Sequence, residues 1–144
     1  MLEYKHWPPH FKPTEFSQSG GNKQEVPNEK YWTRLRHLSW QMEIVRAVFN
    51  DSVIKILSGY RTPEYNKKIH GAKASQHMQA RACDFTVYDD DFMDDFSTEL
   101  IGKRLIELMK HEVIAKGGVG IYPTFVHYDI RGNIATWKGS RTGT

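Results

Sequence analysis

Residues 75–88 read Ser-Gln-His-Met-Gln-Ala-Arg-Ala-Cys-Asp-Phe-Thr-Val-Tyr, and the pattern changes within this stretch. The first part, up to Ala80, has no regular period and predicts a loop. From Cys83 to Tyr88 apolar and polar residues alternate, which predicts a β-strand. The stretch therefore places one loop residue, His77, shortly before a carboxylate, Asp84, near the start of a strand.

Helices and short strands are predicted on both sides of this stretch. Apolar residues recur at steps of three and four after Asn28 and again after Ser97, and both of these residues are suited to capping a helix. Val53 to Leu57 predicts a strand, and Thr62-Pro63 predicts the start of a short helix. The inward face of the first long helix is expected to hold Leu35, Leu38, Met42, Val45 and Phe49. The inward face of the second is expected to hold Leu100, Ile101, Leu105, Leu108, Met109 and Val113. Gly117-Gly118 is expected to end the second helix.

Three further short strands are predicted at residues 119–122, 125–130 and 134–137, separated by turn residues. Strands joined in this way favour an antiparallel meander. Together with the two helices they predict an α+β fold, a small antiparallel sheet packed against two main helices. We expect one domain over residues 1–144, with residues 1–27 forming an irregular N-terminal arm.

Composition excludes several classes of protein. The chain has 144 residues and a net charge of +3, and its Lys and Arg residues form no stripe, which argues against nucleic acid as a partner. No run approaches the ~20 apolar residues of a membrane span, and the N-terminus lacks the apolar core of a signal peptide. The single cysteine, Cys83, cannot form an internal disulfide and is expected to be a small buried residue. We expect a monomer.

His77, Asp84 and His127 are the candidates for a metal site. His127 lies inside the predicted strand around residues 125–130. Two histidines and a carboxylate are a donor set used by catalytic zinc, which takes three protein ligands and leaves a fourth position to water. Spacing alone does not decide the matter, because a histidine inside a strand is more often an ordinary sheet residue.

Several motifs, in this order, resemble the zinc D-alanyl-D-alanine carboxypeptidase and peptidoglycan endopeptidase family, in particular its short phage and bacterial branch. The resemblance runs from about Phe11 to Trp137. The motifs that carry it are Thr14-Glu15-Phe16, Ser58-Gly59-Tyr60-Arg61-Thr62-Pro63-Glu64-Tyr65-Asn66, Gly71-Ala72, Ser75-Gln76-His77 with Asp84, Gly120-Ile121-Tyr122, and Phe125-Val126-His127-Tyr128-Asp129-Ile130-Arg131-Gly132.

This resemblance implies an α+β fold shared with the hedgehog signalling domain. It implies one zinc ion per chain, held by His77, Asp84 and His127. It also implies that Arg61 binds the substrate, through either a terminal carboxylate or the scissile carbonyl oxygen. A guanidinium suits both tasks, because its charge is permanent and its donors form a fork. The alternative for Arg61 is a structural salt bridge.

The chain departs from the better-studied relatives at Thr124. Those relatives carry an acidic residue three positions before the last histidine, where it acts as base toward the zinc-bound water. Asp129 is the nearest acid in sequence, and residues two apart on a strand share a face, so Asp129 is expected to lie beside His127. It would act either as the acid/base or as the partner that orients His127.

The function implied is zinc-dependent hydrolysis of amide bonds in peptidoglycan peptides, by a carboxypeptidase or an endopeptidase. A single small domain without a signal peptide fits a phage lysin or a part of a virion. The alternative is a non-catalytic zinc-containing binding or structural module of the same fold, which the missing acid at Thr124 keeps open. The acidic stretch from Asp89 to Asp95 lacks the spacing of a calcium loop and is expected to be a solvated loop.

Overall fold

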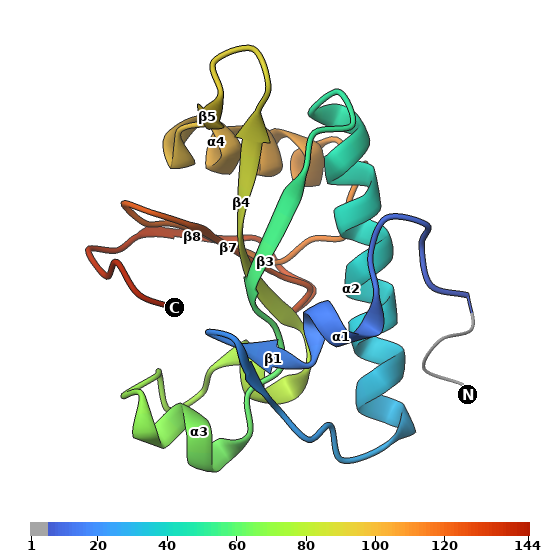
Figure 1. Ribbon diagram of the computed structural model, residues 1–144, viewed down its shortest axis with the longest axis vertical. Helices are drawn as coiled ribbons and strands as arrows, with labels where there is room; N and C mark the ends of the chain where they lie inside the picture. The colour runs from blue at the N-terminus through green and yellow to red at the C-terminus, as the bar shows by residue number, and fades with distance from the viewer. Residues whose placement is uncertain (1–5) are drawn as a thin grey trace.

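The computed structural model describes residues 6–144, so the first five residues of the N-terminal arm lie outside the described part (Figure 1). Helices and strands are mixed along the chain, as expected for an α+β fold. In chain order they are α1 (Pro13–Phe16), β1 (Gln18–Ser19), β2 (Asn22–Lys23), α2 (Glu29–Val48), β3 (Ile54–Ser58), α3 (Pro63–Lys68), the 3₁₀ helix η2 (Gln76–Gln79), β4 (Ala82–Asp89), β5 (Asp94–Asp95), α4 (Thr98–Lys110), β6 (Gly118–Ile121), β7 (Val126–Asp129) and β8 (Ala135–Lys138).

The strands form one sheet in the order β2-β1-β3-β4-β7-β6-β8, with β5 paired to the end of β4. The described pairs are antiparallel except β6 with β8, which are parallel with Gly118 opposite Ala135. The α+β fold with a sheet is confirmed, but the prediction of a simple C-terminal meander is wrong. After β7 the chain crosses over, so that β8 pairs with β6 and becomes the edge strand.

The sheet has one apolar face and one polar face, because side chains alternate along each central strand. One set is apolar and belongs to the hydrophobic core: Cys83, Phe85, Val87, Val119, Ile121, Val126 and Tyr128. The residues between them include Asp84, His127 and Asp129, which are also buried. The alternation therefore places the polar candidates together on the face of the sheet opposite the core.

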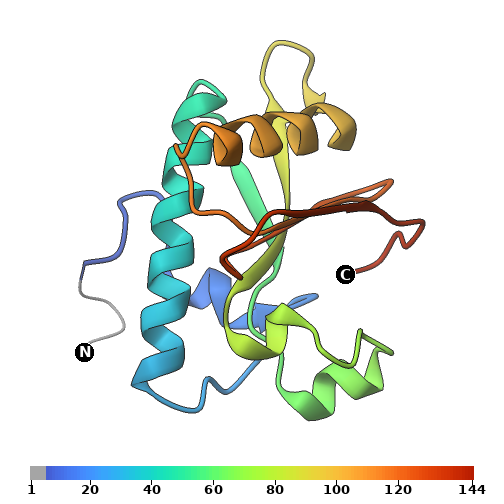
Figure 2. The ribbon, with the colours of Figure 1, turned by 180° about the vertical axis from the view of Figure 1, so that it is seen from behind.

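Two long helices cover the apolar face. The Asn28 side chain accepts a hydrogen bond from the backbone N–H of Tyr31 at the start of α2, and Ser97 caps α4 through Leu100 in the same way. Figure 2 shows α4 crossing in front of β4, with α2 alongside. No helix in residues 6–144 combines the length and apolar composition needed to cross a bilayer.

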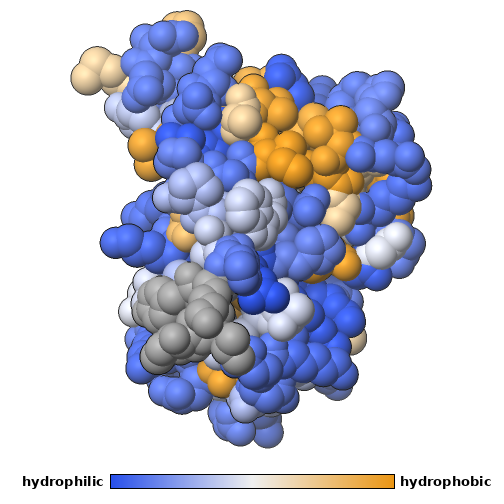
Figure 3. Space-filling model, turned by 90° about the vertical axis from the view of Figure 1, so that its right-hand side faces the viewer, coloured by the Kyte–Doolittle hydropathy of each residue, from blue (hydrophilic) through white to orange (hydrophobic). Residues whose placement is uncertain are grey.

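The α2 side of the molecule keeps some apolar surface. Ile44 and Val48 pack on the core but are only partly buried. Figure 3, which views the molecule from the side on which α2 lies, shows a compact apolar area surrounded by hydrophilic residues. The described residues include nothing that covers this area.

The second long helix ends earlier than expected, at Lys110 rather than at Gly117-Gly118. Glu112 has a φ of 59°, its N–H bonds the carbonyl of Met109, and the next N–H bonds the carbonyl of Leu108. This pair of bonds is a Schellman motif, which usually has glycine at the left-handed position. With glutamate there, the sequence carries no local stop signal, and two residues predicted to face inward, Leu100 and Val113, are exposed instead.

Part of the N-terminal arm is regular, so its prediction as irregular is wrong for residues 13–23. Pro13 begins the short helix α1, and β1 and β2 form a small hairpin that extends the sheet next to β3. Phe16 is fully buried, and its carbonyl accepts the N–H of Tyr60. These elements are two to four residues long, which is too short for any period to show in the sequence.

Glu112 provides a test of how α4 ends. Glu112→Gly is expected to raise the free energy of unfolding by about 1 kcal/mol, because glycine adopts the left-handed conformation without strain. Glu107→Gly, inside the helix, is the matched control and is expected to lower it by about 1 kcal/mol. Urea denaturation measures both. Destabilisation of similar size in the two variants would contradict the assignment of the Schellman motif.

Candidate metal centre

Three elements bring His77, Asp84 and His127 together. Asp84 in β4 and His127 in β7 are direct partners across neighbouring antiparallel strands. His77 comes from η2, and Ser75 caps the start of this helix with a hydroxyl that accepts the N–H of His77. Ala80, at a φ of 57°, ends η2 and turns the chain into β4. The loop expected before the strand thus contains a short helix, and this helix carries a candidate ligand to the polar face of the sheet.

The potential ligand atoms converge on one point. His77 Nε2 lies 3.1 Å from Asp84 Oδ1, and His127 Nδ1 lies 3.0 Å from the same oxygen. All three atoms lie within 4.8 Å of one another, and the three residues are buried. Within residues 6–144 no other group of three or more such side chains converges in this way. The donor set and its compactness fit a tetrahedral zinc ion, which binds nitrogen and oxygen ligands at about 2.0–2.2 Å.

Hydrogen bonds on the far side of each imidazole fix which nitrogen faces this point. His77 Nδ1 lies 2.8 Å from the carbonyl oxygen of Gly59, an acceptor, so this nitrogen carries the proton. His127 Nε2 lies 2.7 Å from Asp129 Oδ2 and donates to it in the same way. When both rings are neutral, as metal binding requires, Nε2 of His77 and Nδ1 of His127 offer their lone pairs to the point beside Asp84 Oδ1. Partners of this kind set the tautomer and orientation of metal-binding histidines.

Asp129 has the geometry of an orienting residue. Its side chain is fully buried, and Oδ1 accepts the N–H of Gly118 at 2.9 Å and Nε of Arg131 at 2.9 Å. Oδ2 accepts from His127 and from Arg131 Nη2 at 2.7 Å. Burial alone would raise the pKa of Asp129, but the hydrogen bonds from His127 and Arg131 hold it well below its ordinary value. With both oxygens occupied, the carboxylate faces His127 as a partner and has no free oxygen for an acid/base role.

Arg61 is both ion-paired and part of the cleft. It is 3% exposed, and its Nη2 lies 3.4 Å from Asp84 Oδ2 and 2.8 Å from the backbone oxygen of Thr144. Burial lowers the pKa of Arg61, while the negative charge of Asp84 opposes that shift. The two roles considered for Arg61, structural salt bridge and substrate binding, are therefore compatible in this geometry.

The central carboxylate is strongly favoured in its charged form. Burial would raise the pKa of Asp84, but the two imidazoles, by charge and by hydrogen bonding, hold it well below its ordinary value. The histidines differ from each other. Burial lowers the pKa of His77, whereas hydrogen bonds from His127 to Asp129 and Asp84 outweigh burial and raise the pKa of His127 to about 9.

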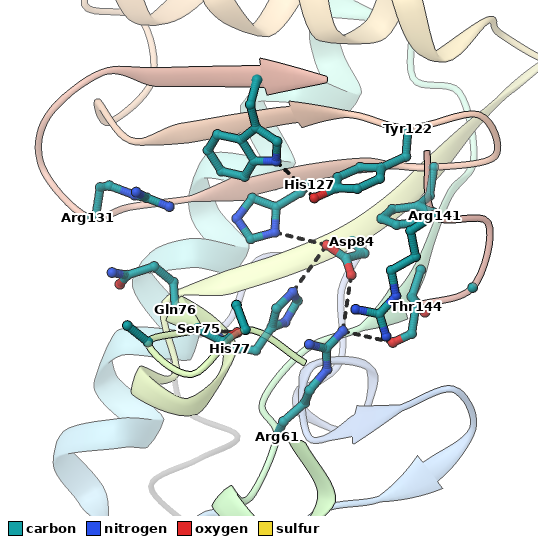
Figure 4. A pocket seen from close by; sticks show the side chains of 15 residues that line it. Arg61, Ser75, Gln76, His77, Asp84, Tyr122, His127, Arg131, Arg141 and Thr144 are labelled. Atoms are coloured by element: carbon teal, nitrogen blue, oxygen red, sulfur yellow. Dashed lines mark hydrogen bonds and ion pairs between the residues drawn. The ribbon is translucent and has the colours of Figure 1, made fainter. Parts of the chain in front are cut away.

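The cleft beside these residues is small, with a volume of about 150 Å³ (Figure 4). Several residues that line it were not identified from the sequence as site residues. They are Ala72, Ala74, Ser75, Gln76, Tyr122, Phe125, Arg131, Trp137, Arg141, Gly143 and Thr144. Of the charged and aromatic members, Tyr122, Phe125 and Arg131 belong to the motifs quoted above, whereas Trp137 and Arg141 lie outside them.

Trp137 reaches the site because of the parallel pairing of β8. Gly120 pairs with His127 on one side and with Trp137 on the other, so the three residues lie in one row across the sheet. A Cβ atom at Gly120 would lie 2.5 Å from Trp137 Nε1, so only glycine leaves room for the indole. The ring centroids of Trp137 and His127 are 5.3 Å apart. The glycines at 118 and 120 were the available sequence signal for this close approach.

Thr124 stands where the better-studied relatives carry an acidic residue, and within residues 6–144 no acidic side chain takes the place of that residue in the cleft. Thr124 is exposed in the turn before β7, and its hydroxyl donates to the carbonyl of Thr142 at 2.7 Å. Among the described residues that line the cleft, Asp84 is the one with an acidic side chain. Cys83 points into the core, and burial raises the pKa of its thiol. The acidic stretch from Asp89 to Asp95 forms the tip of the β4–β5 hairpin, far along the strand from the cleft.

Replacing Asp129 tests its role as the partner of His127. Asp129→Asn keeps the shape but weakens the acceptor for His127 Nε2–H, so zinc affinity is expected to fall by about 10–100-fold. Competition with a chromogenic chelator measures the affinity. Asp95→Asn, on the exposed hairpin, is the control and is expected to leave it unchanged. Unaltered zinc affinity in Asp129→Asn, in a variant that folds, would rule out the orienting role.

Zinc binding is also expected to depend on pH through His127. Below its raised pKa of about 9 the ring is protonated in the absence of metal, and zinc requires the neutral ring. Each unit of pH below that value should therefore weaken apparent zinc affinity by about tenfold, because one proton must leave. His77, whose pKa is lowered, adds little in this range. An affinity that is constant between pH 7 and 9 would contradict this assignment.

Comparison with known proteins agrees with the geometry. The profile of the family described as Peptidase M15 matches residues 9–129. No significant match to a curated protein was found. The matched region contains Arg61 and the three candidate ligands, and it ends at Asp129, before β8. Because this match covers most of the chain, the protein belongs to the peptidase M15 family, the zinc D-alanyl-D-alanine carboxypeptidase family.

Proposed function

We propose that the protein is a zinc-dependent hydrolase that cleaves amide bonds in peptidoglycan stem peptides or their cross-links. The observation that carries the proposal is the convergence of His77 Nε2, Asp84 Oδ1 and His127 Nδ1 within 4.8 Å of one another beside a cleft. Family membership supports the same chemistry. One zinc ion per chain is expected, because these side chains provide one set of three ligands.

The ligand set suits a catalytic rather than a purely structural metal. Structural zinc sites use four protein ligands, whereas catalytic sites use three and leave one position open. Zinc bound here would lower the pKa of a water molecule toward ~7 and polarise a substrate carbonyl. With zinc bound, His77 and His127 would be neutral ligands with fixed tautomers, so Asp84 would supply the one negative charge and the site would keep a net positive charge for this task.

The surroundings of Arg61 support a role in stabilising negative charge on the substrate. Its guanidinium is buried, permanently charged and directed to the side of Asp84 away from the two imidazoles (Figure 4). Ser19 and Asn66 accept from its Nε and Nη1 and hold the fork in place. A preorganised donor of this kind acts on a developing oxyanion or on a substrate carboxylate without reorganising during the reaction.

A non-catalytic role is the second candidate, and one observation favours it. A hydrolytic zinc site needs a group that accepts the proton of the attacking water, and no acidic side chain other than that of Asp84 lines the cleft among the described residues. Asp129 is fully engaged with His127 and Arg131. A zinc-containing binding module or virion component would need no such group. As a peptidase, the protein would act on the cell wall as a phage lysin or from the virion.

Hydrolysis of cell-wall peptides separates the two candidates. Purified zinc-loaded protein is expected to release fragments from peptidoglycan, and excess chelator is expected to stop the release. Arg61→Ala should retain zinc but lose activity by about 100–1,000-fold, because one donor to the oxyanion is removed. Lys103→Ala, an exposed charge on α4, is the control. Release products are identified by mass spectrometry, which also determines the bond cleaved.

Two results would contradict the proposal. Tight zinc binding at the site without any release of fragments would favour the non-catalytic module. Full activity in Arg61→Ala would remove the role given to this residue and leave the salt bridge with Asp84 as its function.

A further inference from the structure

Tyr122 directly follows the last residue of β6 and lines the cleft next to the candidate metal centre. Residues two apart share a face of a strand, so Tyr122 continues the face that holds Gly120, the cross-strand partner of His127. Figure 4 shows Tyr122 on one side of Asp84 and Arg61 on the other. The tyrosine therefore belongs to the His127 side of the cleft, opposite the guanidinium.

The backbone of Tyr122 is held from two directions. Its N–H donates to the carbonyl of Phe125 at 3.1 Å, which closes the tight turn between β6 and β7. Its carbonyl oxygen accepts a hydrogen bond from the hydroxyl of Thr98 at the start of α4. The residue is thus tied both to the hairpin that carries His127 and to one of the long helices, so its position relative to the metal centre is fixed.

The ring of Tyr122 fits closely among its neighbours. It stacks on the ring of Phe125, with the centroids 4.5 Å apart and the planes inclined by 10°. A Cβ atom at Gly120 would lie 2.8 Å from Cε1 of the tyrosine, and a Cβ atom at Gly139 would overlap Cε2. The missing side chains at these two positions make the space that the ring fills, and this close packing gives the hydroxyl a defined place in the cleft.

The hydroxyl of Tyr122 retains a proton that it can donate. Nε1 of Trp137 lies 2.8 Å from the phenol oxygen, and because an indole nitrogen can only donate, the phenol oxygen is the acceptor. Within residues 6–144 no other hydrogen bond involves this hydroxyl, so its own O–H is available to a ligand in the cleft. The bond from Trp137 also polarises the phenol, which makes its O–H a stronger donor.

An amide hydrolase needs such a donor at the reacting carbonyl. As water adds to the carbonyl carbon, the π electrons of the carbonyl move to its oxygen, which becomes negatively charged. Donors that are already in place stabilise this charge without reorganising. The two histidines cannot provide one, because their N–H groups are bonded to the carbonyl of Gly59 and to Asp129. Tyr122 offers a donor on the His127 side of the cleft.

We propose that the hydroxyl of Tyr122 is a catalytic hydrogen-bond donor to the carbonyl oxygen of the scissile amide, and that Trp137 is the positioning residue that orients this hydroxyl. This inference rests on the proposed function and deepens it. Tyr122 donates a hydrogen bond and keeps its proton throughout. Because the oxygen gains its charge only as the reaction proceeds, the bond is stronger in the transition state than in the bound substrate. The hydroxyl therefore contributes to kcat more than to KM.

Removing the hydroxyl alone tests the kinetic part of the proposal. Tyr122→Phe keeps the ring stacked on Phe125 and removes the donor. In the zinc-loaded full chain, kcat on soluble peptidoglycan fragments is expected to fall by about 100-fold or more, with little change in KM. Zinc affinity, measured by competition with a chelator, is expected to stay the same. Tyr88→Phe, at the hairpin end of β4, is the matched control and is expected to change neither quantity.

Ligand binding measures the same interaction without turnover. One ligand is the phosphinate analogue of D-alanyl-D-alanine, whose tetrahedral anionic group stands in for the amide after water has added. The other is the ketomethylene analogue, which keeps a planar, uncharged carbonyl at the same place and cannot be hydrolysed. By calorimetry on the zinc-loaded chain, Tyr122→Phe is expected to weaken binding of the phosphinate about 100-fold and of the ketone about tenfold at most.

The same pair of ligands tests the role of Trp137. Trp137→Phe removes the indole N–H that orients the phenol but leaves the donor itself in place. The preference for the phosphinate over the ketone is therefore expected to fall by about tenfold at most, less than in Tyr122→Phe. An unchanged preference in Trp137→Phe would remove the positioning role given to this residue.

Three outcomes would overturn the role of Tyr122. They are undiminished hydrolysis by Tyr122→Phe, phosphinate affinity that is absent or the same in wild type and variant, and equal weakening of the phosphinate and the ketone, which would show a purely structural role. Retained phosphinate affinity with loss of the alkaline limb of kcat would make Tyr122 the acid for the leaving amine instead. Selective weakening of the phosphinate in a protein that hydrolyses no peptide would contradict the proposed hydrolase but leave Tyr122 as a donor to a tetrahedral anion.

Discussion

A buried carboxylate is the feature on which the rest of the site depends. Asp84 is 3% exposed, and a charge at that depth is tolerated only when it is paired and hydrogen-bonded. His77, His127 and Arg61 provide the partners, and each comes from a different part of the chain. The same requirement implies that replacing His77 or His127 affects both the fold and the metal site.

The alternation of side chains along the strands brings hydrogen-bonding partners to the buried Asp84. On β4 and β7 every second residue packs under the helices, so the intervening residues are carried to the opposite face at fixed spacing. Antiparallel pairing then sets Asp84 directly against His127. Gly120 continues the row without a side chain and admits Trp137 next to His127. A second carboxylate, Asp129, fixes His127 from behind, so the orientation of the ligand comes from the strand that carries it.

Much of this was predictable from the sequence, for identifiable reasons. The helix starts at Asn28 and Ser97 have local signals in their caps, and β4 has a local signal in its alternation. The candidate ligands could be named because the motifs around His77 and His127 resemble a known family. By contrast, the parallel pairing of β8 and the approach of Arg141 and Thr144 to Arg61 depend on contacts between residues distant in sequence, which leave no local pattern. The end of α4 was missed because Glu112 occupies a position where glycine is usual.

The central claim is that His77 Nε2, Asp84 Oδ1 and His127 Nδ1 hold one zinc ion. A crystal structure of the zinc-loaded protein, with anomalous scattering recorded at the zinc edge, tests it most directly. The expected result is one peak per chain at about 2.0–2.2 Å from these three atoms, with Nε2 of His127 still on Asp129. A peak elsewhere, or a His127 ring turned so that Nε2 binds the metal, would contradict the claim.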